Sequence, residues 1–364
     1  MTDLLDAHDV LLADLDGTLY CGRVVVPGAL DAVRGAAQRG VRTVYITNNA
    51  SRRPSDVAEQ LAELGFPVET EDVVASSQAA AALLAQQLPA GARVLVVGTD
   101  ALVAEVLAVG LTRTEQADDA VAVVQGHDPD TGWRRLAEAT VALRAGAVWV
   151  ACNLDPTLPT ERGPLPGNGS MVAALRIASG REPQVAGKPA PTLLVDAVAR
   201  TGARAALMAG DRLDTDVEGG RAAGLATLLV LTGASDAAEL LAAPSARRPD
   251  YVGADLGALT LSAEDLAPGP RPGWDARVSD TGELTLSATG GDADPLDALR
   301  ALCAVHWAAG GGAAQLVVAG PEATRAVRAL GLDGTGSGSV TVAAADTTTR
   351  GDSGARIDTA GAQR

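Results

Sequence analysis

Short apolar runs that each end in polar residues constrain the fold of this chain more than any other feature. The runs are rich in Val, Leu and Ile, and segments suited to helices separate them. Such alternation is typical of buried parallel strands joined by helical crossovers. We therefore predict an α/β fold with a parallel central sheet. Its strands should occupy residues 10–13, 41–46, 205–209 and 226–231.

The polar residues that end these runs predict where a ligand would bind. Asp14, Thr47 and Asp211 each stand at or just beyond the end of a predicted strand. In open parallel sheets, ligands bind in the crevice outside the carboxyl ends of the strands. We expect the three side chains to converge on one site.

The chain divides into further units around this sheet. Between Thr47 and Lys188 lie 140 residues, far more than one crossover needs, and they repeat the alternation of strand and helix. We interpret them as an inserted α/β cap. A Pro- and Gly-rich linker at residues 267–273 leads to a small C-terminal α/β extension. The predicted units are a core at 1–78 and 186–258, a cap at 79–185, an extension at 274–344 and a disordered tail at 345–364.

Within these units the same patterns predict individual elements. The cap should hold strands at 94–97, 120–124 and 147–151, and helices at 101–109 and 133–144. The extension should hold strands at 284–287 and 315–318, and a helix at 296–307.

Composition excludes several classes of partner. With 45 acidic against 29 basic side chains, the net charge of −16 opposes binding to nucleic acid or to an anionic membrane. No apolar run approaches the roughly 18 residues of a membrane-spanning helix. Three widely spaced cysteines give neither a disulfide framework nor a zinc pattern. We expect a soluble cytoplasmic protein with free thiols, and assembly into a homo-oligomer stays open.

Lys188 is the single lysine among 29 basic residues. An ammonium is a compact cation that suits one phosphate or carboxylate, whereas arginine presents a planar fork. Lys188 therefore becomes a candidate for binding an anion. The alternative is chance retention on an exposed loop.

Two acidic segments follow predicted strands. Asp14 and Asp16 belong to the run Asp-Leu-Asp-Gly-Thr-Leu-Tyr, and alternate residues of an extended segment face the same side. Such a pair can divide the roles of nucleophile and general acid or base. The segment Gly-Asp-Arg-Leu-Asp-Thr-Asp at 210–216 adds oxygen ligands that suit Mg²⁺. The alternatives are an ordinary turn for the first segment and helix capping for the second.

Thr47, Asn48 and Asn49 offer a hydroxyl and two amides as donors to phosphate oxygens, or form an ordinary cap or turn. Together with Lys188 and the two acidic segments, in this order, they resemble the haloacid dehalogenase (HAD) superfamily of phosphotransferases. The resemblance spans about residues 8–258 and implies a Rossmann-like parallel core with an inserted cap.

This resemblance implies roles for individual residues. Asp14 would be the nucleophile that forms an aspartyl-phosphate, and Asp16 the acid that protonates the leaving alcohol and then activates water. Thr47 and Lys188 would hold the phosphoryl group.

The resemblance also implies a magnesium site. Mg²⁺ would be bound by the Asp14 carboxylate, the Asp16 backbone carbonyl and Asp211, with Asp216 in support through water. Asp214 matches the acidic pair of the family less well.

The position of the cap is similar to subfamily IIA, whose C2-type caps occur in nucleotide, phosphoglycolate and pyridoxal-phosphate phosphatases. Residues 151–163 and 166–170, followed by the extension, are similar to phosphatases of this family that act on glycerol 3-phosphate. There the extension resembles part of an acetyltransferase fold. The run at 310–312 lacks the pattern of an acetyl-CoA pyrophosphate loop, so we do not expect acetyl transfer.

The cap should set substrate choice, because the core contacts mainly the shared phosphoryl group. Asn153, Asp155 and Arg162 are the candidate contacts, although each could instead stabilise its own loop. His127 and Asp128 carry the same ambiguity. Arg52 and Arg53 are expected to form a solvated helix start rather than a phosphate clamp.

These observations favour an Mg²⁺-dependent phosphatase acting on a small phosphorylated alcohol, with glycerol 3-phosphate as the leading substrate and glycerophospholipid metabolism as its setting. Phosphoglycolate, pyridoxal phosphate and nucleotides are alternative substrates. A dehalogenase would need neither Mg²⁺ nor Asp16, and a phosphomutase would keep the phosphoryl group on its product. The alternative of another class is a phosphometabolite-binding scaffold.

Overall fold

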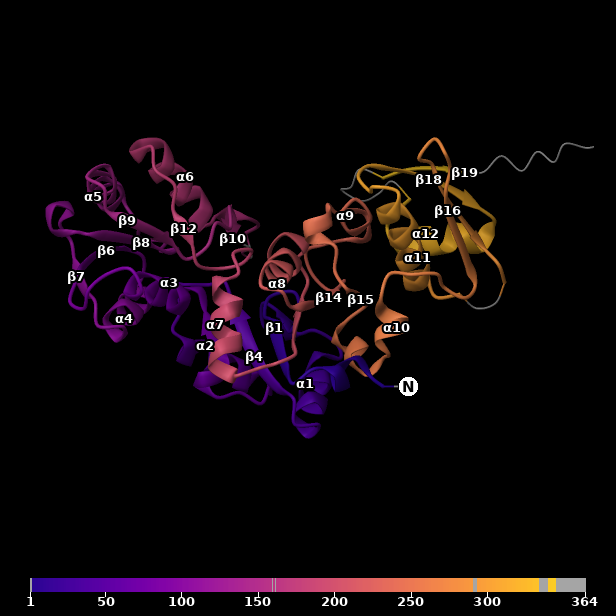
Figure 1. Ribbon diagram of the computed structural model, residues 1–364, viewed down its shortest axis with the longest axis horizontal. Coiled ribbons are helices and arrows are strands. Elements are labelled where there is room, and N and C mark those ends of the chain that lie inside the picture. The colour runs from indigo at the N-terminus through magenta and orange to yellow at the C-terminus, as the bar shows by residue number, and fades with distance from the viewer. Residues whose placement is uncertain (1, 159, 161, 291–292, 334–339, 345–364) are drawn as a thin grey trace, which may run out of the picture.

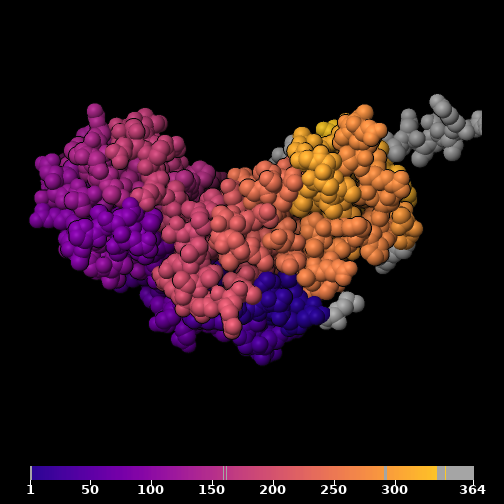
Figure 2. Space-filling view, viewed as in Figure 1, coloured from indigo at the N-terminus to yellow at the C-terminus, as the bar shows by residue number. Residues whose placement is uncertain are grey.

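The structure is a computed structural model and describes residues 2–158, 160, 162–290, 293–333 and 340–344. Three α/β units succeed one another from left to right in Figure 1. The cap lies at one end, the C-terminal unit at the other, and the core between them. The space-filling view in Figure 2 shows the same two lobes on either side of the core.

The core is built on a six-stranded parallel sheet, which confirms the predicted fold class. Its strands stand in the order β15-β14-β13-β1-β4-β5. Their apolar side chains are almost all buried, as expected for parallel strands covered on both faces. The strands are β1 (Val10–Asp14), β4 (Arg42–Thr47), β5 (Val73–Ala75), β13 (Ala206–Gly210), β14 (Ala226–Val230) and β15 (Tyr251–Gly253).

Helices cover both faces of this sheet. Leu11 and Tyr45 point into one apolar cluster with α1 (Ala29–Gln38) and α2 (Pro54–Glu63). Leu12 and Val44, one residue along each strand, point into the other cluster. The second face is covered by α3 (Ser76–Ala85) and α7 (Thr192–Thr201). Because successive side chains of a strand point to opposite faces of the sheet, each strand contributes to both apolar clusters.

The cap has its own parallel sheet, in the order β12-β9-β8-β6-β7. The strands predicted at 94–97, 120–124 and 147–151 correspond to β6, β8 and β9. A short hairpin, β10 and β11, extends from it. The cap elements are β6 (Arg93–Val97), α4 (Asp100–Ala108), β7 (Thr112–Thr114), β8 (Ala122–Gln125), α5 (Trp133–Arg144), β9 (Val148–Ala151), β10 (Thr157–Leu158), β11 (Leu165–Pro166), α6 (Asn168–Ser179) and β12 (Gln184–Val185).

The C-terminal unit holds a sheet in the order β16-β17-β18-β19, whose first pair is antiparallel and whose other pairs are parallel. Trp274 begins a strand here, so the predicted linker leads directly into this sheet. The predicted tail at 345–364 lies outside the described residues. The elements are β16 (Trp274–Val278), β17 (Leu284–Ala288), α11 (Pro295–Ala308), β18 (Ala314–Ala319), α12 (Pro321–Ala329) and β19 (Val340–Ala344).

The helical segment predicted between β13 and β14 is short, since one π-helical turn (Leu213–Val217) precedes a five-residue α8 (Glu218–Ala222). Several other short elements lack a sequence signal strong enough for prediction. They are β2 (Tyr20–Cys21), β3 (Val24–Val25), α9 (Ala237–Leu241), α10 (Ala263–Leu266) and 3₁₀ turns at Leu4–Ala7, Thr70–Asp72, Ala117–Asp119, Ser245–Arg247 and Leu256–Thr260.

Within the described ranges, no helix is both long enough and apolar enough to cross a membrane.

Candidate active site

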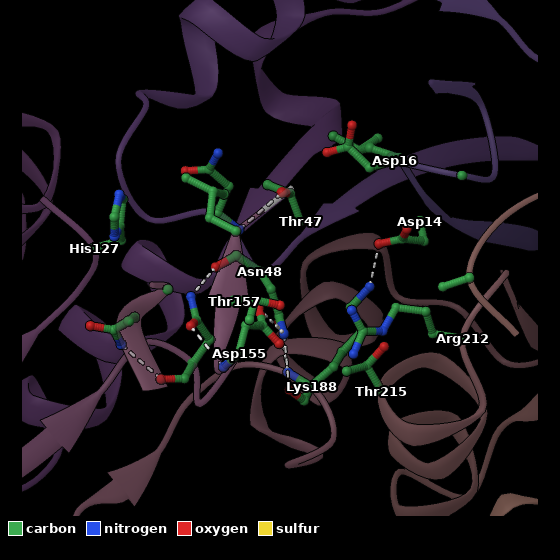
Figure 3. A pocket seen from close by; sticks show the side chains of 18 of the residues that line it. Asp14, Asp16, Thr47, Asn48, His127, Asp155, Thr157, Lys188, Arg212 and Thr215 are labelled. Carbon is green, nitrogen blue, oxygen red and sulfur yellow. Dashed lines mark hydrogen bonds and ion pairs between the residues drawn. The ribbon is translucent and has the colours of Figure 1, made fainter. Parts of the chain in front are cut away.

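The carboxyl ends of three neighbouring strands meet at one edge of the core sheet. Asp14 ends β1, Thr47 ends β4, and Asp211 directly follows β13. Because β1 pairs with both other strands, the three residues lie side by side. They border a cavity of about 580 Å³ between the core and the cap (Figure 3). It is also lined by the predicted residues Asp16, Asn48, Asn49, Asn153, Asp155 and Lys188.

Lys188 lies at the bottom of this cavity and is only 2% exposed, so it is not a residue of an exposed loop. Its Nζ donates to Asp14 Oδ1 at 2.5 Å and to Asp216 Oδ1 at 2.6 Å. Burial by itself would lower the pKa of Lys188, but the two carboxylates raise it above its usual value. Lys188 is therefore a permanent cation beside Asp14.

Three carboxylates crowd together around this lysine. Oxygens of Asp14, Asp211 and Asp216 all lie within 4.8 Å of one another. Burial is the main cause that raises the pKa of each to about 6, and the neighbouring carboxylates add to it. One ammonium does not neutralise three carboxylates, and hard oxygen donors suit a divalent cation. The donor set therefore fits Mg²⁺, with Asp216 inside the cluster rather than outside it.

Two glycines make room for these acids. Gly17 adopts φ +88°, and a Cβ there would collide with the Asp211 carboxylate. A Cβ at Gly210 would collide with the Asp216 carboxylate in the same way. The glycine of the first acidic segment is thus required by close approach of Asp211 as well as by the turn.

The side chains that follow β4 are held in fixed positions. The backbone N–H of Asn49 donates to Thr47 Oγ1 at 3.1 Å, which leaves the Thr47 hydroxyl proton available to another acceptor. Asn48 pairs with the backbone of Lys188, whose N–H and carbonyl each lie 2.9 Å from its amide. Asn49 Oδ1 accepts from the Ser51 N–H at 2.8 Å. Both amides thus shape loops, and phosphate contact by either asparagine stays a prediction.

Amides also join the cap to the core at this site. Asn153 Nδ2 donates to the carbonyl of Asn48 at 2.6 Å. Asn168, at the start of α6, donates to the carbonyl of Asn153 at 2.7 Å. Asp155 lines the cavity beside them, and its Oδ2 lies 3.4 Å from Asn48 Nδ2. The loop that carries Asp155 is therefore tied to the loop that carries Lys188.

Other cap candidates divide between the cavity and the surface. His127 lines the cavity, whereas Asp128 pairs with Arg135 at 2.6 Å. Arg162 is exposed, and the lining residues do not include it. Asn153 and Asp155 both lie in the cavity wall, and their contact with the substrate stays a prediction.

Asp16 stands at the mouth of the cavity. Burial raises the pKa of its carboxyl, while the charges of Arg52 and Lys188 oppose that rise. A raised pKa favours the protonated form that a general acid needs. Arg52 was expected to be a solvated helix start, but it lines the cavity and donates to the Asp56 carbonyl at 2.7 Å.

Arg212 is the lining residue that sequence reasoning missed. It is half-buried and forms a two-point pair with Asp214, at 3.0 Å from Nε and 2.9 Å from Nη2. Its position directly after Asp211 was the available signal. The side chain could have pointed to either side of the turn, so the signal did not decide its place.

Family models match the first part of the core together with the start of the cap, and the second part of the core. The haloacid dehalogenase-like hydrolase model matches residues 11–112, and a HAD-hydrolase-like model matches residues 185–259. A model of a GCN5-related N-acetyltransferase like domain matches residues 271–332. Together with the relatives below, these matches show that the chain belongs to the haloacid dehalogenase-like hydrolase family, as its motifs predict.

The relatives are phosphatases. The chain is 53% identical to the D-glycerol 3-phosphate phosphatase of Mycobacterium tuberculosis over 317 residues, which cover 85% of this chain and 88% of that protein. A crystal structure of glycerol phosphate phosphatase from M. tuberculosis in complex with magnesium matches with a TM-score of 0.85 and 50% identity, over 91% of this chain and 99% of that one. The acid sugar phosphatase of Staphylococcus aureus is 35% identical over 231 residues, 63% of this chain and 88% of that protein.

Proposed function

We propose that this protein is a magnesium-dependent phosphomonoester hydrolase that releases phosphate from glycerol 3-phosphate. The observation that carries the proposal is Lys188 Nζ, held 2.5 Å from Asp14 and 2.6 Å from Asp216 in the cavity under the cap. A buried nucleophile beside a fixed cation suits attack on a phosphoryl group. Two relatives are named D-glycerol 3-phosphate phosphatase and acid sugar phosphatase, which supports a small phosphorylated alcohol as substrate.

The reaction we propose has two displacements. A carboxylate oxygen of Asp14 attacks phosphorus, the bond from phosphorus to the alcohol oxygen breaks, and Asp16 gives its proton to the leaving alcohol. Asp16 then takes a proton from water, whose oxygen attacks phosphorus. The bond from phosphorus to the Asp14 oxygen breaks, so that inorganic phosphate leaves and the Asp14 carboxylate is restored. The Thr47 hydroxyl and the Lys188 ammonium hold the phosphoryl oxygens through both steps.

Magnesium would be held by the carboxylates of Asp14 and Asp211 and by the backbone carbonyl of Asp16, with Asp216 beside them. The ion supplies positive charge to the phosphoryl oxygens and favours the ionised form of Asp14. Lys188 provides the second cation, so the carboxylates and the incoming phosphate share two positive partners.

Other phosphatase substrates are the second candidate. A cavity of about 580 Å³ has room for esters larger than glycerol 3-phosphate, including sugar phosphates, nucleotides and pyridoxal 5′-phosphate. A dehalogenase is disfavoured by the presence of Asp16 and the acidic cluster. The scaffold alternative is disfavoured because Asp14, Asp16, Thr47 and Lys188 all border one cavity.

The decisive experiment measures phosphate release with Mg²⁺ from glycerol 3-phosphate, phosphoglycolate, pyridoxal 5′-phosphate, nucleoside monophosphates and sugar phosphates. We expect the highest kcat/KM for glycerol 3-phosphate. A higher value for another ester would keep the phosphatase and replace its substrate. No release from any ester would leave the scaffold as the remaining candidate.

We also propose a cytoplasmic location and no nucleic-acid or membrane partner. The net charge of −16 supports the second point. Cys152 and Cys303 are buried free thiols, which suits a reducing compartment. Assembly into a homo-oligomer remains to be tested by light scattering.

A further inference from the structure

Beyond the phosphoryl site, two opposite charges border the cavity from different units. Asp155 comes from the loop after β9 of the cap, and Arg212 from the loop after β13 of the core. Figure 3 shows the two side chains on either side of Lys188. The alcohol part of a phosphoester bound at Asp14 and Lys188 would extend into the space that these two residues border.

Arg212 presents a fixed donor to this space. Asp214 engages its Nε and Nη2 at 3.0 and 2.9 Å, and this two-point contact sets the plane of the guanidinium. This pairing does not use the third guanidinium nitrogen, Nη1. Because the plane is set by Asp214, the side chain loses little further freedom when a ligand accepts from Nη1.

Asp155 presents an acceptor that is only weakly engaged by the protein. Its backbone N–H donates to Asn153 Oδ1 at 3.3 Å, and its carboxylate has one long contact, 3.4 Å, with Asn48 Nδ2. Burial raises the pKa of this carboxyl, and the charge of Arg212 is the largest influence that opposes the rise. Asp155 and Arg212 thus act on each other electrostatically, but within the described part of the chain they form no direct ion pair.

Among the described residues, Arg212 and Asp155 border one cavity without a direct ion pair, so they suit a group that can both accept and donate. A hydroxyl does so, since it accepts from Arg212 and donates to Asp155. A carboxylate on the substrate would be attracted by Arg212 but repelled by Asp155. An apolar group would remove water from both charges and return no hydrogen bond.

We propose that Arg212 and Asp155 together bind a hydroxyl group on the alcohol part of the substrate, and that the enzyme thereby selects neutral polyol phosphates over phosphoesters that carry a carboxylate. The proposal rests on the phosphatase function proposed above and names the specificity pair of that site. In this proposal Asp155 repels esters that carry a carboxylate and also binds esters that carry a hydroxyl. Combining repulsion of one ligand with attraction of another is a common way to achieve specificity.

The test compares three esters in the full-length enzyme with Mg²⁺. Glycerol 3-phosphate carries hydroxyls, n-propyl phosphate has the same carbon chain without them, and 2-phosphoglycolate carries a carboxylate. The variants are Asp155→Asn, which removes the charge, Asp155→Ala, which also removes the acceptor, and Arg212→Met, which removes the donor. Asp130→Asn removes an exposed cap carboxylate outside the cavity and serves as the matched control.

We expect the ratio of kcat/KM for glycerol 3-phosphate over n-propyl phosphate to fall about tenfold or more in Asp155→Ala and Arg212→Met. In Asp155→Asn the ratio of kcat/KM for 2-phosphoglycolate over glycerol 3-phosphate should rise about tenfold, because the side chain no longer repels the substrate carboxylate. The control should leave both ratios as they are in the wild type. Using ratios removes any general loss caused by a disturbed fold or metal site.

Failure of this inference differs from failure of the proposed function. If the wild type releases phosphate from the esters and the ratios do not change in the Asp155 and Arg212 variants, the hydroxyl-binding pair is wrong and the phosphatase stands. If the wild type releases phosphate from none of the esters, both proposals are overturned. Should Asp155→Ala fail to fold, the charge-only variant Asp155→Asn still decides the repulsion.

Discussion

The cap and the C-terminal unit are both small α/β additions to one core, but they differ in whether their polar groups reach the cavity. The cap contributes Asn153, Asp155 and Asn168 to the wall of the cavity. Among the described residues, none that lines this cavity comes from beyond Ala234. The cap therefore offers polar atoms to a ligand, and the C-terminal unit does not.

The polar side chains of the C-terminal unit instead hydrogen-bond to the core backbone. Arg300 is 4% exposed and donates from Nε and Nη2 to the carbonyl of Val252, at 3.1 and 2.7 Å. The Trp307 indole donates to the carbonyl of Leu241 at 3.1 Å. Buried polar groups that are satisfied within the protein stabilise a docked interface and require no ligand.

An apolar cluster also runs without a break from the core into the C-terminal unit, joining α9 and β15 to α11. Leu213 and Val217, the first and last residues of the turn that carries Asp216, belong to this cluster. The C-terminal unit thus supports the acidic turn from behind, whereas the cap faces it across the cavity.

The glycine run at 310–312 belongs to this docking surface. Gly311 adopts φ +73°, and a Cβ there would collide with the Arg248 guanidinium. Arg248 donates to the carbonyl of Gly310 at 3.2 Å and lies 5.4 Å from the centre of the Trp307 ring. The absence of acetyl transfer stays a prediction, and this use of the turn supports it.

The largest effect should come from the nucleophile on the cavity side. We expect Asp14→Asn to lower kcat by roughly 10⁴-fold or more, because an amide cannot form the aspartyl-phosphate. The melting temperature of the metal-free protein should not fall, since one of three crowded carboxylates is removed. Steady-state phosphate release and thermal melting measure both. Wild-type turnover in this variant would refute the mechanism.

The second effect concerns the cation at the bottom of the cavity. Lys188→Met should lower kcat by roughly 10²- to 10³-fold, as is typical when one positive or donor group at a developing charge is lost. Lys188→Arg should not restore it, because the site is buried and built around a compact ammonium. Full activity in Lys188→Arg would show that charge alone suffices there.

The third effect is the pH dependence of metal binding. Burial and mutual repulsion raise the pKa of Asp14 and of Asp211 to about 6. Protons therefore compete with Mg²⁺ as the pH falls through 6, and the half-saturating Mg²⁺ concentration should rise roughly tenfold for each of these two carboxylates between pH 7.5 and pH 5. Mg²⁺ titrations followed by thermal shift test this. An affinity independent of pH would mean that other groups hold the ion.

The smallest effect on catalysis should come from the docking side. Arg300→Met leaves the Val252 carbonyl without its donor and should destabilise the protein by about 1–3 kcal/mol. The relative kcat/KM values for different esters should not change, because Arg300 does not line the cavity. Denaturant unfolding and the ester panel provide the two readouts. Arg328→Met, at a side chain 73% exposed, is the control. A changed substrate preference in Arg300→Met would show that the C-terminal unit, like the cap, influences the cavity.

Local patterns predicted most of the core and much of the cap. Apolar runs that end in Asp14, Thr47 and Asp211 mark strands whose carboxyl ends must share one edge, since parallel pairing aligns them. The helical segment predicted after Asp211 begins with a π-helical turn at 213–217, a form that residue spacing does not specify. The three-residue strands β5 and β15 are too short to show a periodicity. Long apolar runs were therefore predicted correctly, and segments of a few residues were missed.

By itself, the sequence determined the acid motifs at the strand ends, the lone cation Lys188 and the order of the units, because each depends on residue type and local spacing. Only the tertiary structure decided that Asn48 holds the lysine loop, that Asp216 joins the carboxylate cluster and that Arg212 and Asp155 border the same cavity. Those relations join residues as far apart in the sequence as Asp14 and Asp216. They follow from how the core sheet brings its strand ends together and how the cap packs on the core, which no local pattern specifies.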